Sequence, residues 1–193
     1  MGPLGRLNAA TRMATPLAQA EYVKFQQSAG GQVVEGSLYY HYARLIENLY
    51  ALERVEQLLE DPDILSKDLR TASSGIANSE GVGVLEAPRG TLFHHYWVDE
   101  NGVLEKVNLI VATGHNNYAM SRGVEEVARA EFDGRPVTEG MLNRIEMGVR
   151  AYDPCLSCST HAVGQMPLVV EVRGPKNELC GQFQRPESPG GQP

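Results

Sequence analysis

The sequence predicts a mainly helical α+β fold with one small antiparallel β-sheet. Two segments, Ser37 to Glu60 and Thr138 to Val149, carry apolar residues at helical spacing. Between them, Asn101-Gly102 separates two strand-like runs, which is a strong signal for a β-hairpin. A chain of 193 residues is long enough for one domain with a single core.

The first part of the chain is predicted to be a loop followed by a helix. Met1–Ala14 shows little hydrophobic periodicity and contains glycine and proline, as if the chain had been entered midway. Thr15-Pro16 is typical of a helix start, an N-cap followed by proline in the first turn. We therefore expect a helix over Leu17–Gln27, ended by Gly30-Gly31.

The longest predicted helix is capped by Ser37 and runs to about Glu60, where Asp61-Pro62 ends it. Its apolar residues recur at helical spacing and are interpreted as core packing: Leu38, Tyr42, Leu45, Ile46, Leu49, Leu52, Val55 and Leu59.

A loop is predicted over Ser66–Gly83, with at most one helical turn. Two strands follow, over Thr91–Val98 and Val103–Thr113, and the turn Asp99–Gly102 joins them.

Two helices and a tail complete the prediction. Asn116–Phe132 is helical in pattern and is broken by Asp133–Pro136. Thr138 is expected to cap the last helix, and Gln165–Val172 to form a short strand. Gln184–Pro193 has the composition of a disordered tail. The last helix buries one face through Met141, Ile145, Met147 and Val149.

Composition argues against several classes of partner. A formal net charge of −7 gives no general attraction to nucleic acid or to an anionic membrane. No apolar run approaches the roughly 20 residues of a membrane span, and no signal-peptide pattern opens the chain. Three cysteines cannot pair completely, which favours a reducing compartment and predicts a cytoplasmic protein.

The densest group of reactive side chains is Asp153-Pro154-Cys155-Leu156-Ser157-Cys158-Ser159-Thr160-His161. Two cysteines at this spacing can direct both sulfurs at one centre, and soft thiolates suit nickel, iron, zinc and copper. Cys155-x-x-Cys158-x-x-His161 fits three ligands of a metal site, with Cys180 as a further candidate. The alternative is a redox pair or an incidental pair of cysteines, and Asp153 is on local evidence a turn residue before proline.

A second group is Glu86-Ala87-Pro88-Arg89-Gly90-Thr91-Leu92-Phe93-His94-His95. Pro88 fixes the backbone and Gly90 permits close approach, so Arg89 can direct its planar donor fork at an acceptor. An isolated Pro-Arg-Gly is more often a surface loop. His94 and His95 point to opposite faces of the predicted strand, and a satisfied core histidine is the simpler interpretation of either.

A third group, Leu109-Ile110-Val111-Ala112-Thr113-Gly114-His115-Asn116-Asn117, is an apolar strand that ends in small and polar residues. Such a strand end is a usual place for a site beside a sheet. The alternative is that Asn116 is simply a helix cap.

In this order, the three groups resemble the C-terminal part of the large subunit of NiFe hydrogenases. The motifs are EAPRGTLFHH (Glu86–His95), VNLIVATGHNN (Val107–Asn117) and RAYDPCLSCSTHAVGQMPL (Arg150–Leu168). The resemblance covers residues 1–168, the first third more weakly, and is greatest to the soluble, NAD-coupled bidirectional group. It implies the C-terminal portion of the large-subunit fold. It also implies reversible heterolytic oxidation of H2, coupled to NAD(P) or a similar acceptor through an iron–sulfur small subunit.

The resemblance implies metal ligands. Cys155 would be a terminal nickel thiolate, and Cys158 would bridge nickel to an iron that carries CO and CN ligands. His161 and the backbone of Leu109 would bind Mg²⁺ or a similar structural ion.

The resemblance also implies the surroundings of the metals. Arg89 would lie over the open edge of the metal pair, and Pro88 would line the cyanide environment. Asp153 would lie nearby, and Cys155 or Arg89 would accept the proton from H2.

One family feature is missing from this sequence. The family supplies a second CxxC from near the N-terminus of its large subunit, and here the only other cysteine is Cys180. We therefore expect the isolated polypeptide to be incomplete and inactive, and another chain to supply the second CxxC. With half the natural core missing, the helix over Ser37–Glu60 should expose an apolar surface.

The resemblance further implies maturation. In the family, nickel chaperones load the metal and an endopeptidase then cuts after the histidine of the last motif. Here that bond is His161–Ala162, so a C-terminal extension over 162–193, of 193 − 161 = 32 residues, is expected to be removed. The sequence retains this extension and so corresponds to a precursor.

Two other functions compete with that of a hydrogenase component. One is a structural zinc module held by Cys155, Cys158 and His161, with Cys180 as a further candidate ligand, and the other is an inactive truncated fragment that only packs against a partner. Nickel and iron bound with a partner chain, zinc bound by the chain alone, or no metal at all would distinguish the three.

Overall fold

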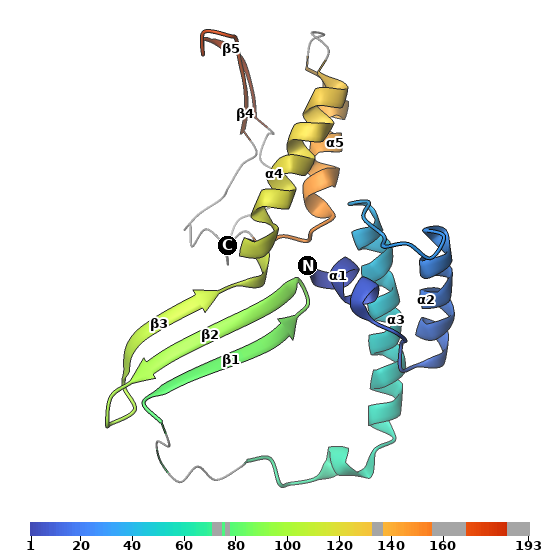
Figure 1. The fold of residues 1–193 in the computed structure, drawn as a ribbon, viewed down its shortest axis with the longest axis vertical. Coiled ribbons are helices and arrows are strands. Elements are labelled where there is room, and N and C mark those ends of the chain that lie inside the picture. The colour runs from blue at the N-terminus through green and yellow to red at the C-terminus, as the bar shows by residue number, and fades with distance from the viewer. Residues whose placement is uncertain (71–74, 76–77, 133–136, 156–168, 185–193) are drawn as a thin grey trace, which may run out of the picture. The chain divides into compact units, whose positions relative to one another are not determined.

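The computed structural model describes residues 1–70, 75, 78–132, 137–155 and 169–184. By its internal contacts the chain divides into two compact units, Met1–Ser159 and Thr160–Pro193. The elements of the first unit are α1 (Gly2–Ala9), α2 (Pro16–Ser28), α3 (Tyr39–Leu59), the short 3₁₀ helix η1 (Pro62–Leu65), β1 (Glu80–Ala87), β2 (Gly90–Val98), β3 (Leu104–Ile110), α4 (Ala112–Glu131) and α5 (Glu139–Arg150) (Figure 1). The second unit contains the antiparallel hairpin of β4 (Val169–Arg173) and β5 (Leu179–Gln184).

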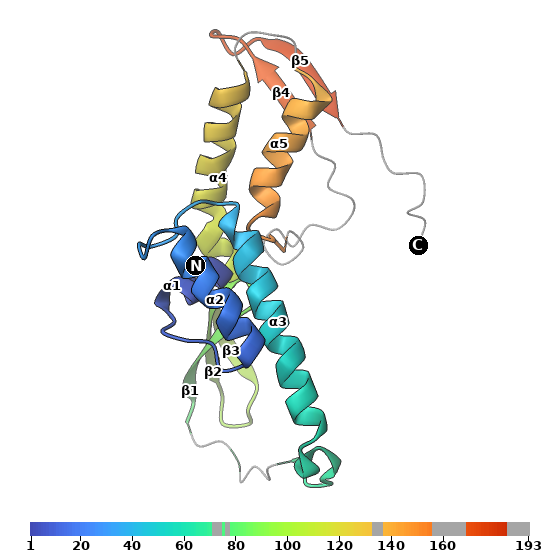
Figure 2. The same cartoon turned by 90° about the vertical axis from the view of Figure 1, so that its right-hand side faces the viewer.

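The main core lies where α1, α2 and α3 pack together, and α2 lies alongside α3 in both views (Figures 1 and 2). Phe25 of α2 is 1% exposed and makes edge contacts with the rings of Tyr39 and Tyr42 of α3. Burial of each such side chain contributes about 1.5–3 kcal/mol. The described core residues are Leu4, Leu7, Ala18, Tyr22, Phe25, Val34, Tyr40, Ala43, Ile46, Ala151 and Tyr152.

The start of α2 is held by a carboxylate from α3. Thr15 is the N-cap residue, as expected, but its hydroxyl donates to Glu53 instead of accepting from the helix. The same carboxylate accepts from the backbone N–H groups of Leu17 (3.0 Å) and Ala18 (2.9 Å). Glu53 therefore takes the role that a capping side chain normally has, and it joins the two helices.

The sheet is antiparallel in the order β1-β2-β3. The turn between β2 and β3 has the predicted Asn-Gly chemistry, with Gly102 at φ +80°. Asp99 stabilises it by accepting from the N–H groups of Asn101 (2.9 Å) and Val103 (2.8 Å).

The helices α4 and α5 pack against each other, and Thr138 caps α5 as predicted by accepting from the N–H of Met141 (3.4 Å). Within the described ranges, no helix is both long enough and apolar enough to cross a membrane.

The fold class is as predicted, but several local expectations were wrong. Residues Gly2–Ala9 form helix α1 and not a loop, because Pro3 is tolerated in a first turn and Leu4 and Leu7 lie on one buried face. Residues from Glu80 form strand β1, where a loop was expected, and strand β5 was not predicted at all.

Two predicted caps do not act as caps. Ser37 does not cap α3 with its side chain; its hydroxyl lies 3.4 Å from that of Tyr152. Helix α4 begins at Ala112, so Asn116 lies inside the helix and is 4% exposed. The predicted second strand consequently ends at Ile110 and not at Thr113.

The interpretation of the α3 apolar residues as core is only partly right. Ile46 is 1% exposed, and Tyr42 and Leu49 pack against the core. The others are exposed, as expected for a helix whose second face lacks a partner: Leu38, Leu45, Leu52, Val55 and Leu59.

The end of the chain is only partly described. The predicted strand over Gln165–Val172 overlaps β4, with residues 165–168 outside the described residues. Most of the predicted disordered tail, residues 185–193, also lies outside them.

Candidate metal centre

The centre of the candidate site is the tight turn that joins β1 to β2 at Pro88-Arg89. Ala87 and Gly90 are paired across it, and Gly90 has φ +139°, a conformation that favours glycine. Gly2 of α1 lies against the turn, so that a Cβ on Gly2 would be 2.9 Å from the carbonyl oxygen of Arg89. The turn is thus packed against the start of α1.

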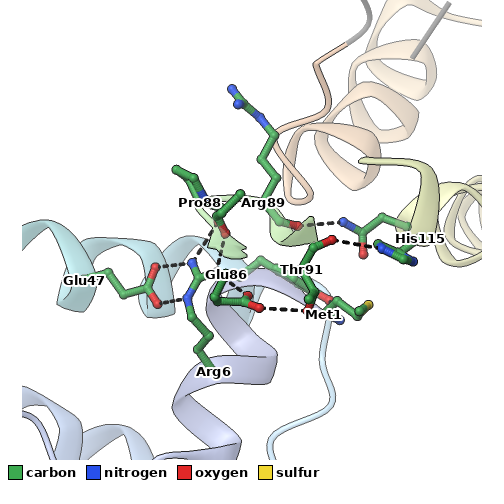
Figure 3. A network of polar contacts seen from close by, with 11 residues as sticks. Met1, Arg6, Glu47, Glu86, Pro88, Arg89, Thr91 and His115 are labelled. Atoms are coloured by element: carbon green, nitrogen blue, oxygen red, sulfur yellow. Dashed lines mark hydrogen bonds and ion pairs between the residues drawn. The ribbon is translucent and has the colours of Figure 1, made fainter. Parts of the chain in front are cut away.

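Arg6 of α1 binds the other side of the same turn (Figure 3). Its guanidinium forms a two-bond pair with the carboxylate of Glu47 (2.6 and 2.7 Å) and a single bond with Glu86 (2.7 Å). It also donates to the carbonyl oxygens of Ala87 (2.7 Å) and Pro88 (2.8 Å). Arg6 was not among the residues singled out from the sequence.

The ionisation of this group follows from its contacts. The hydrogen bond with Glu47 raises the pKa of Arg6, which outweighs the opposing effect of burial. Burial alone would raise the pKa of Glu86, but hydrogen bonds from Thr91 and Arg6 lower it overall. Glu86 is therefore a carboxylate at neutral pH, bonded on one side to Arg6 and on the other to Thr91 (2.8 Å).

Two residues near the start of helix α4 also bind the β1–β2 turn and the residue that follows it. Asn116 donates from Nδ2 to the carbonyl oxygen of Arg89 (3.1 Å), and Nε2 of His115 lies 3.0 Å from the carbonyl oxygen of Thr91. The predicted group over Leu109–Asn117 therefore does reach the arginine turn, through residues of a helix.

Arg89 itself extends away from Arg6, toward the segment that follows α5 (Figure 3). Its Nε donates to the carbonyl oxygen of Asp153 and lies 3.2 Å from the carboxylate oxygen Oδ2 of the same residue. Asp153 has φ +50°, a left-handed conformation that aspartate tolerates better than most residues. The turn and the cysteine segment are thus joined by two contacts between Arg89 and Asp153.

The residues just before Asp153 are anchored in the main core. Ala151 is fully buried, and its carbonyl oxygen accepts from Nη2 of Arg44 (3.0 Å). The ring of Tyr152 packs on that of Tyr40 with centroids 4.7 Å apart. Helix α3 therefore fixes where the cysteine segment leaves the core.

Cys155 lies next to α4. Its backbone N–H donates to the hydroxyl of Thr113 (3.4 Å), a residue that is 4% exposed. Cys155 is disulfide-bonded in this structure. Its sulfur could bind a metal only after reduction to the thiolate.

The remaining predicted site residues are distributed as follows. Cys158 and His161 lie outside the described residues. Pro88 is exposed in the turn, and Leu109 lies in β3 opposite His94. Cys180 is a free, exposed thiol in β5. Over the described residues alone, no group of three histidine, cysteine or acidic side chains is close enough to hold a metal ion.

The two histidines of the strand have structural partners. Nδ1 of His94 lies 2.5 Å from the hydroxyl of Tyr96. His95 stacks on Trp97 with ring centroids 3.6 Å apart, and its Nε2 lies 2.7 Å from Glu80. Both are half-buried and satisfied by neighbours on the sheet.

The sequence profile of the nickel-dependent hydrogenases matches residues 1–161. This chain belongs to the nickel-dependent hydrogenase family. The match includes the first two motifs and the third as far as His161. Family membership implies a nickel–iron centre, and it does not favour the alternative of a structural zinc module.

Individual hydrogenases support this membership. The chain is 51% identical, over 89% of its length, to the NAD-reducing hydrogenase HoxS subunit beta of Cupriavidus necator, and 43% identical, over 88%, to an F420-non-reducing hydrogenase of Methanococcus voltae. It superposes on the solved structure of an NAD⁺-reducing NiFe hydrogenase in the H2-reduced state, with a TM-score of 0.76, 46% identity and 83% of this chain covered. The chain spans 36% of the length of each of these two relatives and 35% of the solved chain.

Proposed function

We propose that this chain supplies the C-terminal part of the nickel–iron site of a cytoplasmic hydrogenase that oxidises H2 and reduces NAD(P) or a similar acceptor. The observation that carries the proposal is the contact of Arg89 with Asp153, two residues before Cys155. It brings together two motifs more than 60 residues apart in the sequence, in a chain that belongs to the nickel-dependent hydrogenases.

The residues present fit the metals that the family implies. Cys155 and Cys158 would hold nickel and iron as thiolates, and two further cysteines would come from polypeptide outside these 193 residues. Bound nickel and iron, the iron with CO and CN ligands, would supply the binding and heterolytic cleavage of H2.

The role proposed for Arg89 follows from the two guanidinium nitrogen atoms that do not take part in its described contacts. Nε is bonded to Asp153, whereas Nη1 and Nη2 have no hydrogen-bond partner among the described residues. In a site closed to water, these two groups would donate to the cyanide nitrogen atoms, where hydrogen bonds are strong. Asp153 would keep the guanidinium oriented, Pro88 would line the same cavity, and the thiolate of Cys155 would accept the proton released from H2.

His161 and the backbone carbonyl of Leu109 would bind Mg²⁺ or a similar ion. Residues 162–193 would be a C-terminal extension that an endopeptidase removes after nickel chaperones have loaded the metal. Two findings support a boundary at this point: the family profile ends at His161, and the first compact unit ends at Ser159. An iron–sulfur small subunit would carry the electrons away.

The test is metal analysis of the chain co-expressed with candidate partner chains. Cys155→Ser should abolish nickel binding and H2 oxidation, because a hydroxyl is a poor ligand for nickel. Cys180→Ser is the matched control and should retain both, because Cys180 is exposed and lies in the extension. Zinc in place of nickel in the unsubstituted complex, or full nickel content in Cys155→Ser, would refute the proposal. So would removal of residues 162–193 from chains that have never been supplied with nickel.

A further inference from the structure

At the β1–β2 turn that carries Arg89, more backbone carbonyl groups accept hydrogen bonds from side chains than is usual for a turn at the surface. A two-residue turn usually leaves its carbonyl oxygens to water. Here each of three successive carbonyls accepts a hydrogen bond from a helix side chain. Arg6 of α1 donates to Ala87 and Pro88, and Asn116 of α4 donates to Arg89. Arg6 supplies two of these three bonds. The position of the turn relative to the helices is therefore set by side chains as well as by strand pairing.

The guanidinium of Arg6 is itself oriented by Glu47 of α3. Its two bonds to Glu47 use Nε and Nη2, the geometry in which a guanidinium and a carboxylate are coplanar. The guanidinium is rigid and planar. When Glu47 of α3 holds its Nε and Nη2 atoms, the N–H groups that bind Ala87 and Pro88 therefore have a fixed direction as well. The side chain of Arg6 is 25% exposed, and that of Glu47 is 23% exposed, so both bonds are partly shielded from water.

The contacts then continue to the cysteine segment. Glu47 orients Arg6, Arg6 holds the carbonyls on either side of the Ala87–Pro88 bond, and the next residue is Arg89. Arg89 in turn binds Asp153.

We propose that Arg6 is a positioning residue for Arg89: it sets where the Arg89 guanidinium lies in the nickel–iron site. The inference rests on the proposed function for its effect on catalysis. The positioning itself is a property of this chain's own residues. A lysine at position 6 would keep the charge and one bond to a carboxylate, but it has no planar fork to hold two carboxylates and two carbonyls together.

The structural test compares Arg6→Lys with Arg129→Lys in the assembled complex. Arg129 is the control because its side chain is 77% exposed and its partner among the described residues is Glu125 of the same helix. Amide hydrogen exchange of the peptide over residues 84–93 should rise at least about threefold in Arg6→Lys and stay unchanged in Arg129→Lys. Unchanged exchange in Arg6→Lys would overturn the proposal, and so would an equal rise throughout α1–α3, which would mean that the core had loosened as a whole.

The functional test is a double-mutant cycle with Arg89→Lys. Arg6→Lys should lower kcat for H2 oxidation by about tenfold with KM and nickel content unchanged, since a misplaced catalytic group costs rate and not metal. In the Arg89→Lys background, the same substitution should cost less than about twofold, because its target has been removed. Equal costs in both backgrounds, or a loss of nickel in proportion to activity, would show a merely structural role. An unsubstituted complex without nickel would refute the proposed function, while the exchange experiment would still decide the positioning.

Discussion

At the scale of single residues, Thr113 supports Cys155 without being part of the cysteine motif. Its hydroxyl accepts the hydrogen bond from the N–H of Cys155 in a place where Thr113 is 4% exposed. A valine has nearly the same shape but cannot accept a hydrogen bond, so Thr113→Val should remove this hydrogen bond. We expect the unfolding free energy to fall by about 1 kcal/mol. Nickel retention during dialysis against a chelator should fall as well.

Thr113→Ser is the control for this change, because it keeps the hydroxyl and loses only a methyl group. If Val and Ser variants retain nickel equally, the hydrogen bond has no part in holding Cys155.

Glu86 makes the stability of the turn depend on pH. Its lowered pKa means that the folded protein favours the carboxylate, which accepts from Arg6 and Thr91. The resulting stabilisation is complete above the ordinary pKa of 4.5 and is lost as the pH falls through the lowered value. Glu86→Gln should therefore lower the thermal midpoint at pH 7, and lower it less at pH 3, where part of this stabilisation has been lost. A midpoint difference that is equal at both pH values would contradict this assignment.

Sequence reasoning singled out some residues of the candidate site and overlooked others, for a physical reason. Arg89, Asp153 and Cys155 stand in dense local motifs with unusual neighbours, so that their chemistry is visible in a short stretch of sequence. Arg6, by contrast, is 82 residues away from Pro88 and 41 residues away from Glu47 in the sequence. A single arginine in a helix has no local signal for such contacts, and only the packing of α1 against the turn brings them about.

At the scale of elements, α2 depends on a residue that is not its own. Glu53 of α3 accepts from Thr15, Leu17 and Ala18 at the first turn of α2. Burial would raise the pKa of Glu53, but these hydrogen bonds lower it overall, so the group is ionised and favourable at the positive end of the helix.

Glu53→Gln should lower the thermal midpoint, because a neutral amide with one acceptor oxygen cannot replace both carboxylate oxygens. Glu56→Gln on the same helix is the control and should have little effect, since Glu56 is exposed. Circular dichroism melting of both variants checks this, and equal midpoints would show that the contact between the helices adds nothing.

Element boundaries were predictable where a local cap or turn decided them, as at Thr138 and at Asn101-Gly102. They were not predictable where packing decided them. Strand β1 contains Gly81 and Gly83, which weaken a strand, and it forms because β2 offers it a complete antiparallel partner.

At the scale of the whole molecule, helical periodicity revealed which residues of α3 share a face but not what that face meets. Leu38, Leu45, Leu52 and Leu59 recur every seven residues and are 58%, 65%, 68% and 64% exposed. A stripe of this kind on a single chain promotes association.

We expect the isolated chain to aggregate at micromolar concentration. The double substitution Leu45→Glu with Leu52→Glu should raise its solubility with little change in thermal midpoint, because both side chains are already in water. Leu7→Ala, at a position that is 2% exposed, should instead lower the midpoint. Sedimentation and melting curves separate these effects, and unaltered solubility of the double variant would show that the stripe is not the cause.

The buried anchor at Ala151 limits how far the segment that carries Cys155 can move. Cys155 is four positions further along the chain, a reach of about 14 Å even when that stretch is fully extended. While Arg44 holds the carbonyl of Ala151, any protein that delivers a metal ion to Cys155 has to bring it inside this short radius. On the proposed function, delivery of the ion would then be a local event beside α3 and α4.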